Sequence, residues 1–224
     1  SKYNIVSEFF ADTNSSFEHN KIINSGMGDT VIYHLFGNCK SSSNIKTVNF
    51  SFNENPVRNE INLFLDGTDC NATVASLGFG RNEKSICDNT IFISHQDESC
   101  KSRQIVKNAL SDGAKAIFQG KIYVASKAQK TDGYQMSNGL ILNDNCEFLV
   151  KPELEIYADD VVCSHGSISG TLNDDHLFYL QSRGIPLLEA QKKLIQAFFE
   201  EVIQELNDKE IINYIQNQIS EILI

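Results

Sequence analysis

The pattern that most constrains this chain is a long series of short β-type runs, from about Asp29 to about Leu172, with no helical pattern between them. Gly, Asn, Asp and Ser separate the runs at intervals of about 8–15 residues. Strands this short cannot bury their apolar faces singly, so the sequence predicts a mainly β core built from many of them. The predicted strands include Thr30–Phe36, Lys46–Phe52, Glu60–Leu65, Thr73–Leu77, Thr90–Ser94, Ala116–Gln119 and Lys121–Ala125.

Two architectures fit these runs: an antiparallel sandwich and a stacked parallel β-solenoid. Glycines that come just before predicted strands slightly favour the coils of a solenoid, namely Gly113, Gly120, Gly139 and Gly166. No fixed repeat length is visible, so periodicity alone leaves both architectures open.

The pattern changes to helical after Leu172. Asn173 is suited to cap a first helix and Gly184 to end it, and Pro186 suits the first turn of a second helix. The second and third helices are one-sided, with apolar positions that include Leu187, Phe199, Ile211, Ile212, Ile215, Ile219 and Ile222. These faces either pack on the β core and on each other or dock a partner.

The sequence therefore predicts three regions. Residues 1–28 are polar and rich in Asn and Ser, which indicates a weak first strand, a loop or the remnant of a truncated helical region. Residues 29–172 form the predicted β core, and residues 173–224 form the predicted helical region.

Composition narrows the function classes. The net charge of −10 disfavours nucleic acid as a partner. No apolar run approaches the roughly eighteen residues of a membrane-spanning helix, and no secretory signal is visible, so we expect no membrane partner. The six cysteines are scattered singly, as is typical of a reducing compartment, so we expect a cytoplasmic protein.

The most informative short motif is Cys163-Ser164-His165, because the sequence contains no general signature of an enzyme class. If these residues form a strand, Cys163 and His165 face the same side. A thiol and an imidazole are natural ligands for iron, zinc or an iron–sulfur cluster, although two ligands do not complete a site. The alternatives are a Cys–His nucleophile, which lacks a recognisable oxyanion hole, and ordinary packing of both residues. His95 and Cys100 form a second, weaker coincidence of the same kind.

Two long segments resemble the SufB/SufD family of iron–sulfur cluster assembly proteins. Lys151 to Pro186 is similar to the C-terminal signature of that family, and His95 to Asp132 resembles its central signature. The central segment contains Phe118-Gln119-Gly120-Lys121-Ile122 and Ala128-Gln129-Lys130-Thr131-Asp132. The stretch Asp159-Asp160-Val161-Val162-Cys163-Ser164-His165-Gly166, together with Leu180, resembles the SufD branch more than the SufB branch.

The resemblance implies a right-handed parallel β-helix followed by C-terminal helices, and so favours the solenoid over the sandwich. It implies a scaffold subunit without its own enzymatic activity, paired with SufB and bound to the ATPase SufC. The implied cargo is iron or a nascent iron–sulfur cluster shared with SufB at Cys163 and His165, with none tightly bound to the isolated chain. SufC would bind the C-terminal helices, and a homodimer is possible in isolation. The alternatives are a β-helix carbohydrate-active enzyme and a purely structural β-solenoid dimer.

Overall fold

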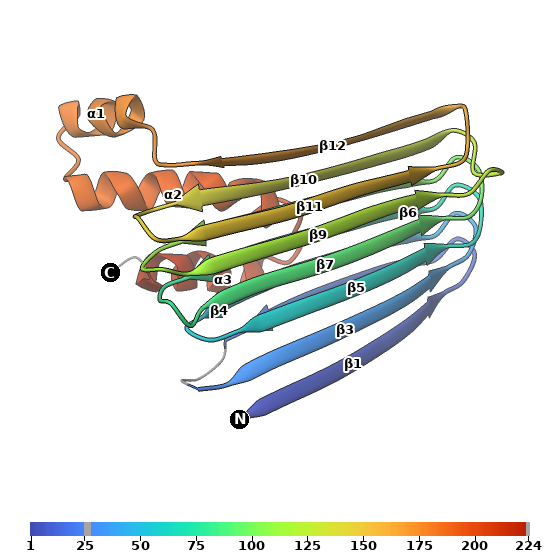
Figure 1. Ribbon diagram of the computed structural model, residues 1–224, viewed down its shortest axis with the longest axis horizontal. Helices are drawn as coiled ribbons and strands as arrows, with labels where there is room; N and C mark the ends of the chain where they lie inside the picture. Colours follow the sequence, from blue (N-terminus) through green and yellow to red (C-terminus); the bar gives the residue numbers. More distant parts are fainter. Residues whose placement is uncertain (25–27, 223–224) are drawn as a thin grey trace.

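A parallel β-solenoid forms the body of the protein in the computed structural model, which describes residues 1–24 and 28–222 (Figure 1). Odd-numbered strands make one six-stranded sheet in the order β1-β3-β5-β7-β9-β11, and even-numbered strands make a second in the order β12-β10-β8-β6-β4-β2. Every paired strand is parallel to its neighbour. The parallel pairing confirms the solenoid and excludes the antiparallel sandwich.

Each coil contributes one strand to each sheet. The strands of the first sheet are β1 (Lys2–Ala11), β3 (Thr30–Cys39), β5 (Val57–Leu65), β7 (Ile86–His95), β9 (Lys115–Val124) and β11 (Glu147–Ile156). Those of the second are β2 (Ser16–Ile23), β4 (Asn44–Asn53), β6 (Asn71–Gly80), β8 (Lys101–Leu110), β10 (Thr131–Ile141) and β12 (Val161–Gly170).

Coil length varies, which explains why the sequence shows no fixed repeat. Val31 pairs with Val57, so that coil takes 26 residues, whereas Lys115 pairs with Glu147, so that coil takes 32. The difference is absorbed in the loops, because the strands must stay in register for their inward side chains to stack.

The turn that follows each of the first five odd-numbered strands, β1 to β9, places a residue in the left-handed region. Asn14, Ser42, Asp69, Ser99 and Lys130 have φ between 58° and 60°. In these five coils, one such residue reverses the chain from the first sheet to the second within a few residues. The corner is therefore sharp even though none of these positions is a glycine.

Residues 1–24 are the first coil of the solenoid, not a separate segment before it. β1 pairs with β3 and β2 with β4, and Ala11 and Ile23 are buried. Asn and Ser residues in its turn and in β2 obscure the strand pattern of this coil in the sequence. Residues 25–27 of the expected 1–28 segment, and 223–224 of the helical region, lie outside the described residues.

Three of the four glycines expected before strands lie inside them: Gly120 in β9, Gly139 in β10 and Gly166 in β12. Ala116–Gln119 and Lys121–Ala125 consequently belong to one strand, β9, which ends at Val124. A side chain at Gly120 would collide with Phe118 and Gln135, and one at Gly139 with Phe148. These glycines make room for large neighbours, and only Gly113, with φ of 82°, serves a turn.

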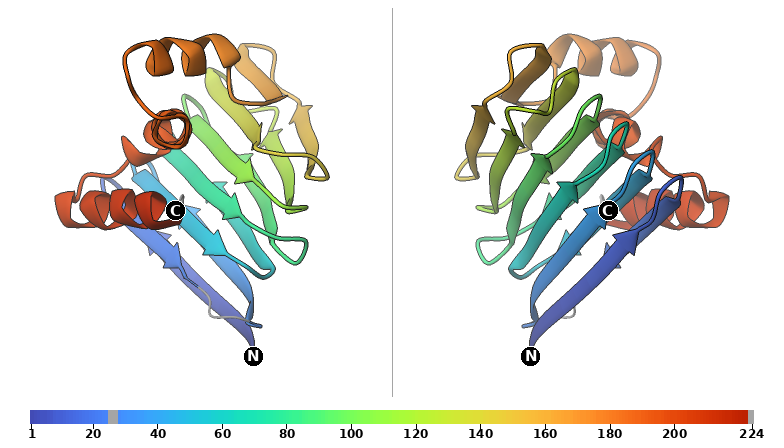
Figure 2. Two further views of the ribbon diagram at one scale, coloured as in Figure 1. Left: turned by 90° about the vertical axis from the view of Figure 1, so that its left-hand side faces the viewer. Right: turned by 90° about the vertical axis from the view of Figure 1, so that its right-hand side faces the viewer.

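The helical region follows its sequence signals closely. The helices are α1 (Asp174–Ser182), α2 (Leu187–Ile203) and α3 (Lys209–Ile222), and the Asn173 side chain accepts a hydrogen bond from the His176 N–H. α2 and α3 cover the outer face of the second sheet, whereas α1 projects above α2 (Figures 1 and 2). Phe199 is fully buried against that sheet, and Leu187 is exposed. None of the described helices is long and apolar enough to cross a membrane.

A lysine lies inside the solenoid near its first coil. Lys21 Nζ donates to Asn59 Oδ1 at 2.6 Å and lies 3.8 Å from the centroid of the Tyr33 ring. The Tyr33 hydroxyl in turn donates to Ser7 Oγ and contacts His19 Nε2. These partners are neutral, and burial lowers the pKa of Lys21 to about 7.

The low pKa of Lys21 gives the first prediction. The unfolded chain binds this proton more tightly than the folded chain, so the contribution of Lys21 to stability falls as pH drops from about 10 to about 7. At pH 7, Lys21→Met should raise the free energy of unfolding by about 1–3 kcal/mol, and the gain should shrink towards pH 9. Urea unfolding at both pH values measures this, with exposed Lys2→Met as the control. An equal loss of stability at both pH values would contradict it.

Candidate functional site

The last coil leaves one end of the solenoid open. Within the described residues β11 pairs only with β9 and β12 only with β10, so each has one unpaired edge. The side chains that face inward from these strands have no further coil above them, and Val150 and Ile156 are exposed although their counterparts in β9, Phe118 and Val124, are buried. An open edge and an apolar end are features that a partner covers.

Cys163 and His165 both lie on β12 and face this open end. Cys163 pairs with Gly133 and His165 with Gln135, and these β10 positions face the interior. Two residues apart on one strand, the side chains share a face at a spacing of about 7 Å. Cys163 is half-buried and His165 is exposed. The strand and the common face predicted from the sequence are therefore present.

The Cys163 thiol lies in a mostly apolar corner. Its neighbours include Ile122, Leu154 and Ala158, and Gly133 beneath it has no side chain to block the space. Burial raises the pKa of this thiol and the nearby Asp132 raises it further, while a backbone hydrogen bond from Gly133 lowers it. A metal ion must therefore displace the thiol proton to bind here.

Beneath His165 runs a column of glutamines that sequence reasoning missed. His165 pairs with Gln135, and Gln135 pairs with Gln104 in the next coil. Gln135 Nε2 donates to the Glu153 carbonyl of the opposite sheet at 3.0 Å, which ties the two sheets together under the site. The sequence does contain a signal for this column, because the two glutamines occupy inward positions where strand alternation predicts apolar residues.

Asp159 and Asp160 precede the motif in the sequence, but a carboxylate from another strand influences Cys163. Asp159 and Asp160 are exposed in the turn before β12, where the Asp160 carbonyl accepts from the Lys130 N–H at 2.6 Å. The carboxylate that influences Cys163 is Asp132, which forms a two-pronged ion pair with Arg103 at 2.8 and 2.9 Å. This pairing lowers the pKa of Asp132 and keeps it charged.

His95 and Cys100 are part of the interior and not of the open end. His95 is fully buried, with its Nε2 2.8 Å from Ser102 Oγ, and burial lowers its pKa to about 4. Cys100 is also buried, and its thiol contacts the Gly67 carbonyl at 3.1 Å. Ordinary packing accounts for both residues.

The described residues contain no group of three or more His, Cys, Asp or Glu side chains that could hold a metal ion. Cys163 and His165 thus place a thiol and an imidazole on one accessible face. A metal usually needs about four ligands, so these two side chains alone do not complete a site.

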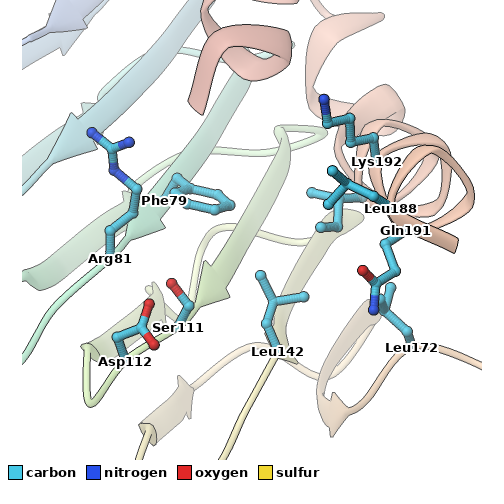
Figure 3. Close-up of a pocket in the computed structure, with 10 residues that line it drawn as sticks. Phe79, Arg81, Ser111, Asp112, Leu142, Leu172, Leu188, Gln191 and Lys192 are labelled. Carbon is cyan, nitrogen blue, oxygen red and sulfur yellow. The ribbon is translucent and has the colours of Figure 1, made fainter. Parts of the chain in front are cut away.

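A second surface lies at the helical end. A groove of about 290 Å³ separates the start of α2 from the ends of β6 and β8, and Leu142, Leu172 and Leu188 line it (Figure 3). Arg81 and Lys192 lie on its polar side. Next to it, α1 contains no buried residue, and Phe178 is 74% exposed.

Thiol accessibility gives the second prediction. Cys39, Cys70, Cys87 and Cys100 are buried, whereas Cys146 and Cys163 are half-buried. Ellman's reagent should therefore modify two thiols of the native chain quickly and the other four only on unfolding. Because the pKa of Cys163 is raised, the rate at which Ellman's reagent modifies this thiol should still increase with pH above pH 9.

Single variants assign these two thiols. Cys163→Ser and Cys146→Ser should each remove one fast thiol. Rapid modification of four or more thiols in the native chain would contradict the buried placement.

Comparison with known proteins shows the family of this chain. Residues 1–198 match the family described as "SUF system FeS cluster assembly, SufBD core domain". The iron–sulfur cluster assembly protein SufD of Escherichia coli is 40% identical over 154 residues, 68% of this chain and 36% of that protein. SufD of Bacillus subtilis is 28% identical over 91% of this chain, and the chloroplastic protein ABCI7 of Arabidopsis thaliana is 29% identical over 98%.

The chain spans less than half the length of these relatives, since the matches cover 36%, 47% and 46% of them. The family match itself covers all twelve strands of the solenoid and continues into α2. The chain therefore belongs to the SufB/SufD family of the SUF iron–sulfur cluster assembly system, as a SufD-like member.

Proposed function

We propose that this chain is a SufD-like scaffold subunit that pairs with SufB through the open end of its solenoid and helps to acquire iron and assemble a nascent cluster there. It works in the cytoplasm and performs no catalysis of its own. The observation that carries the proposal is the position of Cys163 and His165 on β12, a strand with one unpaired edge at the open end.

A shared site would supply the ligands that the described residues of this chain alone do not provide. Cys163 and His165 supply a thiolate and an imidazole, and both suit iron. Their strand has a free edge to which a partner strand can add. A SufB subunit on this edge would bring its own ligands next to them, so cargo held jointly would leave again when the subunits move apart.

In the absence of SufB, the same edge supports a homodimer. The two copies would place two Cys163 and two His165 side chains near one interface. We expect iron to bind the isolated chain weakly and transiently, because no described group of side chains completes a site.

ATP hydrolysis would come from SufC, bound at the helical end. α2 and α3 are occupied with the second sheet, so the exposed apolar residues Phe178 and Leu188, with the groove beside them, are the available contact surface. Deleting residues 173–224 would not isolate this contact surface, because it would also expose the face of the second sheet that α2 and α3 bury.

The third prediction concerns cluster assembly. The chain is co-purified with SufB and SufC, complex formation is followed by gel filtration, and cluster formation is followed by visible absorbance. His165→Ala should leave stability within about 0.5 kcal/mol and leave the complex intact, because the side chain is exposed. Cluster yield should fall severalfold.

Ser167→Ala is the matched control, since Ser167 is exposed two residues further along the same face. It should leave cluster yield unchanged. Normal yield with both His165→Ala and Cys163→Ser would reject the shared site.

The fourth prediction concerns SufC. Phe178→Glu should weaken SufC binding at least tenfold, because it places a charge in an apolar contact. Pairing with SufB should remain. Gln181→Glu adds the same charge to the same exposed helix without removing a ring, so it should bind SufC normally. Equal binding by wild type and Phe178→Glu would place the SufC contact elsewhere.

A further inference from the structure

The outer face of the first sheet carries one aromatic ring from each of five successive coils. No described helix covers this face, since the helices lie on the side of the second sheet (Figure 2). The rings alternate between two rows of paired residues across the strands. Phe10 and Phe64 lie in the row of Asn38, because both pair with it, whereas Phe36 lies two residues before Asn38 on the same face of β3. The five rings are Phe10, Phe36, Phe64, Phe92 and Tyr123.

The first three rings surround a hollow of about 220 Å³, which Glu8 and Asn38 also line. Phe10 is 75% exposed, and Phe36 and Phe64 are each 37% exposed. Phe10 and Phe64 lie two strands apart, a separation of about 9.6 Å between their backbones. That leaves room between the two rings for one compact or planar group.

The charge around this hollow is negative. Glu8 is exposed and pairs with Phe36 across the sheet, and no ion pair involves it within the described part of the chain. Asn38 Nδ2 donates to Asp66 Oδ2 at 2.5 Å, which holds a second carboxylate at the far side. No lysine or arginine lines the hollow. Ring faces and carboxylates both attract a cation.

The same arrangement recurs two coils further along, with the opposite charge. Phe64 and Tyr123 both pair with Ser94, and Phe92 pairs with Lys121. Lys121 Nζ forms an ion pair with Glu155 at 2.5 Å. The protein thus supplies its own cation beside the later rings, and only the first hollow combines three rings with an unpaired carboxylate.

We propose that the hollow between Phe10, Phe36 and Phe64 binds an arginine side chain presented by a partner polypeptide. Guanidinium is planar and weakly hydrated, so it stacks on aromatic rings more readily than a lysine ammonium does. Glu8 orients the cation at the rim. This contact is separate from the open end and from the helical end, so its test can succeed or fail whether or not the proposed function is correct.

The fifth prediction tests this contact with a pair of probes. A blocked peptide with one arginine between Gly and Ser residues is titrated into the ¹⁵N-labelled full chain, in parallel with the same peptide containing citrulline, the neutral isostere of arginine. The arginine peptide should shift backbone amide signals of residues 8–10, 36–38 and 64. The citrulline peptide should bind at least about fivefold more weakly.

Variants localise the effect. Phe10→Ala should weaken the arginine peptide about threefold or more, and Glu8→Gln should weaken it and reduce its salt dependence. Val6→Ala is the control, since Val6 is exposed on the same face of β1 but does not line the hollow. Equal binding of both peptides, shifts confined to other residues, or no binding would each overturn the proposal.

Discussion

The parallel stacking of coils is the constraint on which the rest of this structure depends. A strand in the middle of the stack satisfies its backbone N–H and C=O groups with the coils on both sides, and its inward side chains are buried by the same neighbours. A terminal strand has only one neighbour. The number of neighbouring coils therefore determines both how stable a middle coil is and how accessible a terminal strand is to a partner.

The number of neighbouring coils also explains why the candidate ligand pair lies on β12. In an inner coil, a thiol at the position of Cys163 would be as buried as Cys100, and a histidine would be confined as His95 is. On β12 the same residue types face an open space above Gly133 and Gln135. Position in the stack, more than residue identity, distinguishes a candidate ligand pair from ordinary packing residues in this protein.

Much of this arrangement could be predicted from the sequence. The short runs identified most strands, Asn173 and Gly184 marked the ends of α1, and alternation placed Cys163 and His165 on one face. The first coil was predicted only as a weak strand or a loop, because Asn and Ser are frequent in its turn and in β2. The sequence divides β9 in two because Gly120 resembles a break. In both cases a neighbouring coil, and not the local sequence, determines the structure.

The parts that could not be predicted are contacts between coils. Asp132 and Gln135 become neighbours of the site only through register across β10 and β12, which depends on loop lengths that vary from coil to coil. The internal position of Lys21 is similar, because its partners Tyr33 and Asn59 come from the two following coils of the other sheet. Such pairs have no signature in a single stretch of sequence.

The left-handed residues at the corners have a consequence for how such a protein can change in length. Asn14, Ser42, Asp69, Ser99 and Lys130 mark the same point in successive coils. A segment running from one marker to the next begins and ends in the same backbone conformation at the same corner. Duplication or loss of such a segment would therefore lengthen or shorten the molecule by one whole layer and preserve every face, whereas insertion of one residue within a strand would turn its interior side outward. We therefore expect insertions and deletions in this fold to comprise whole coils that begin and end at these corners.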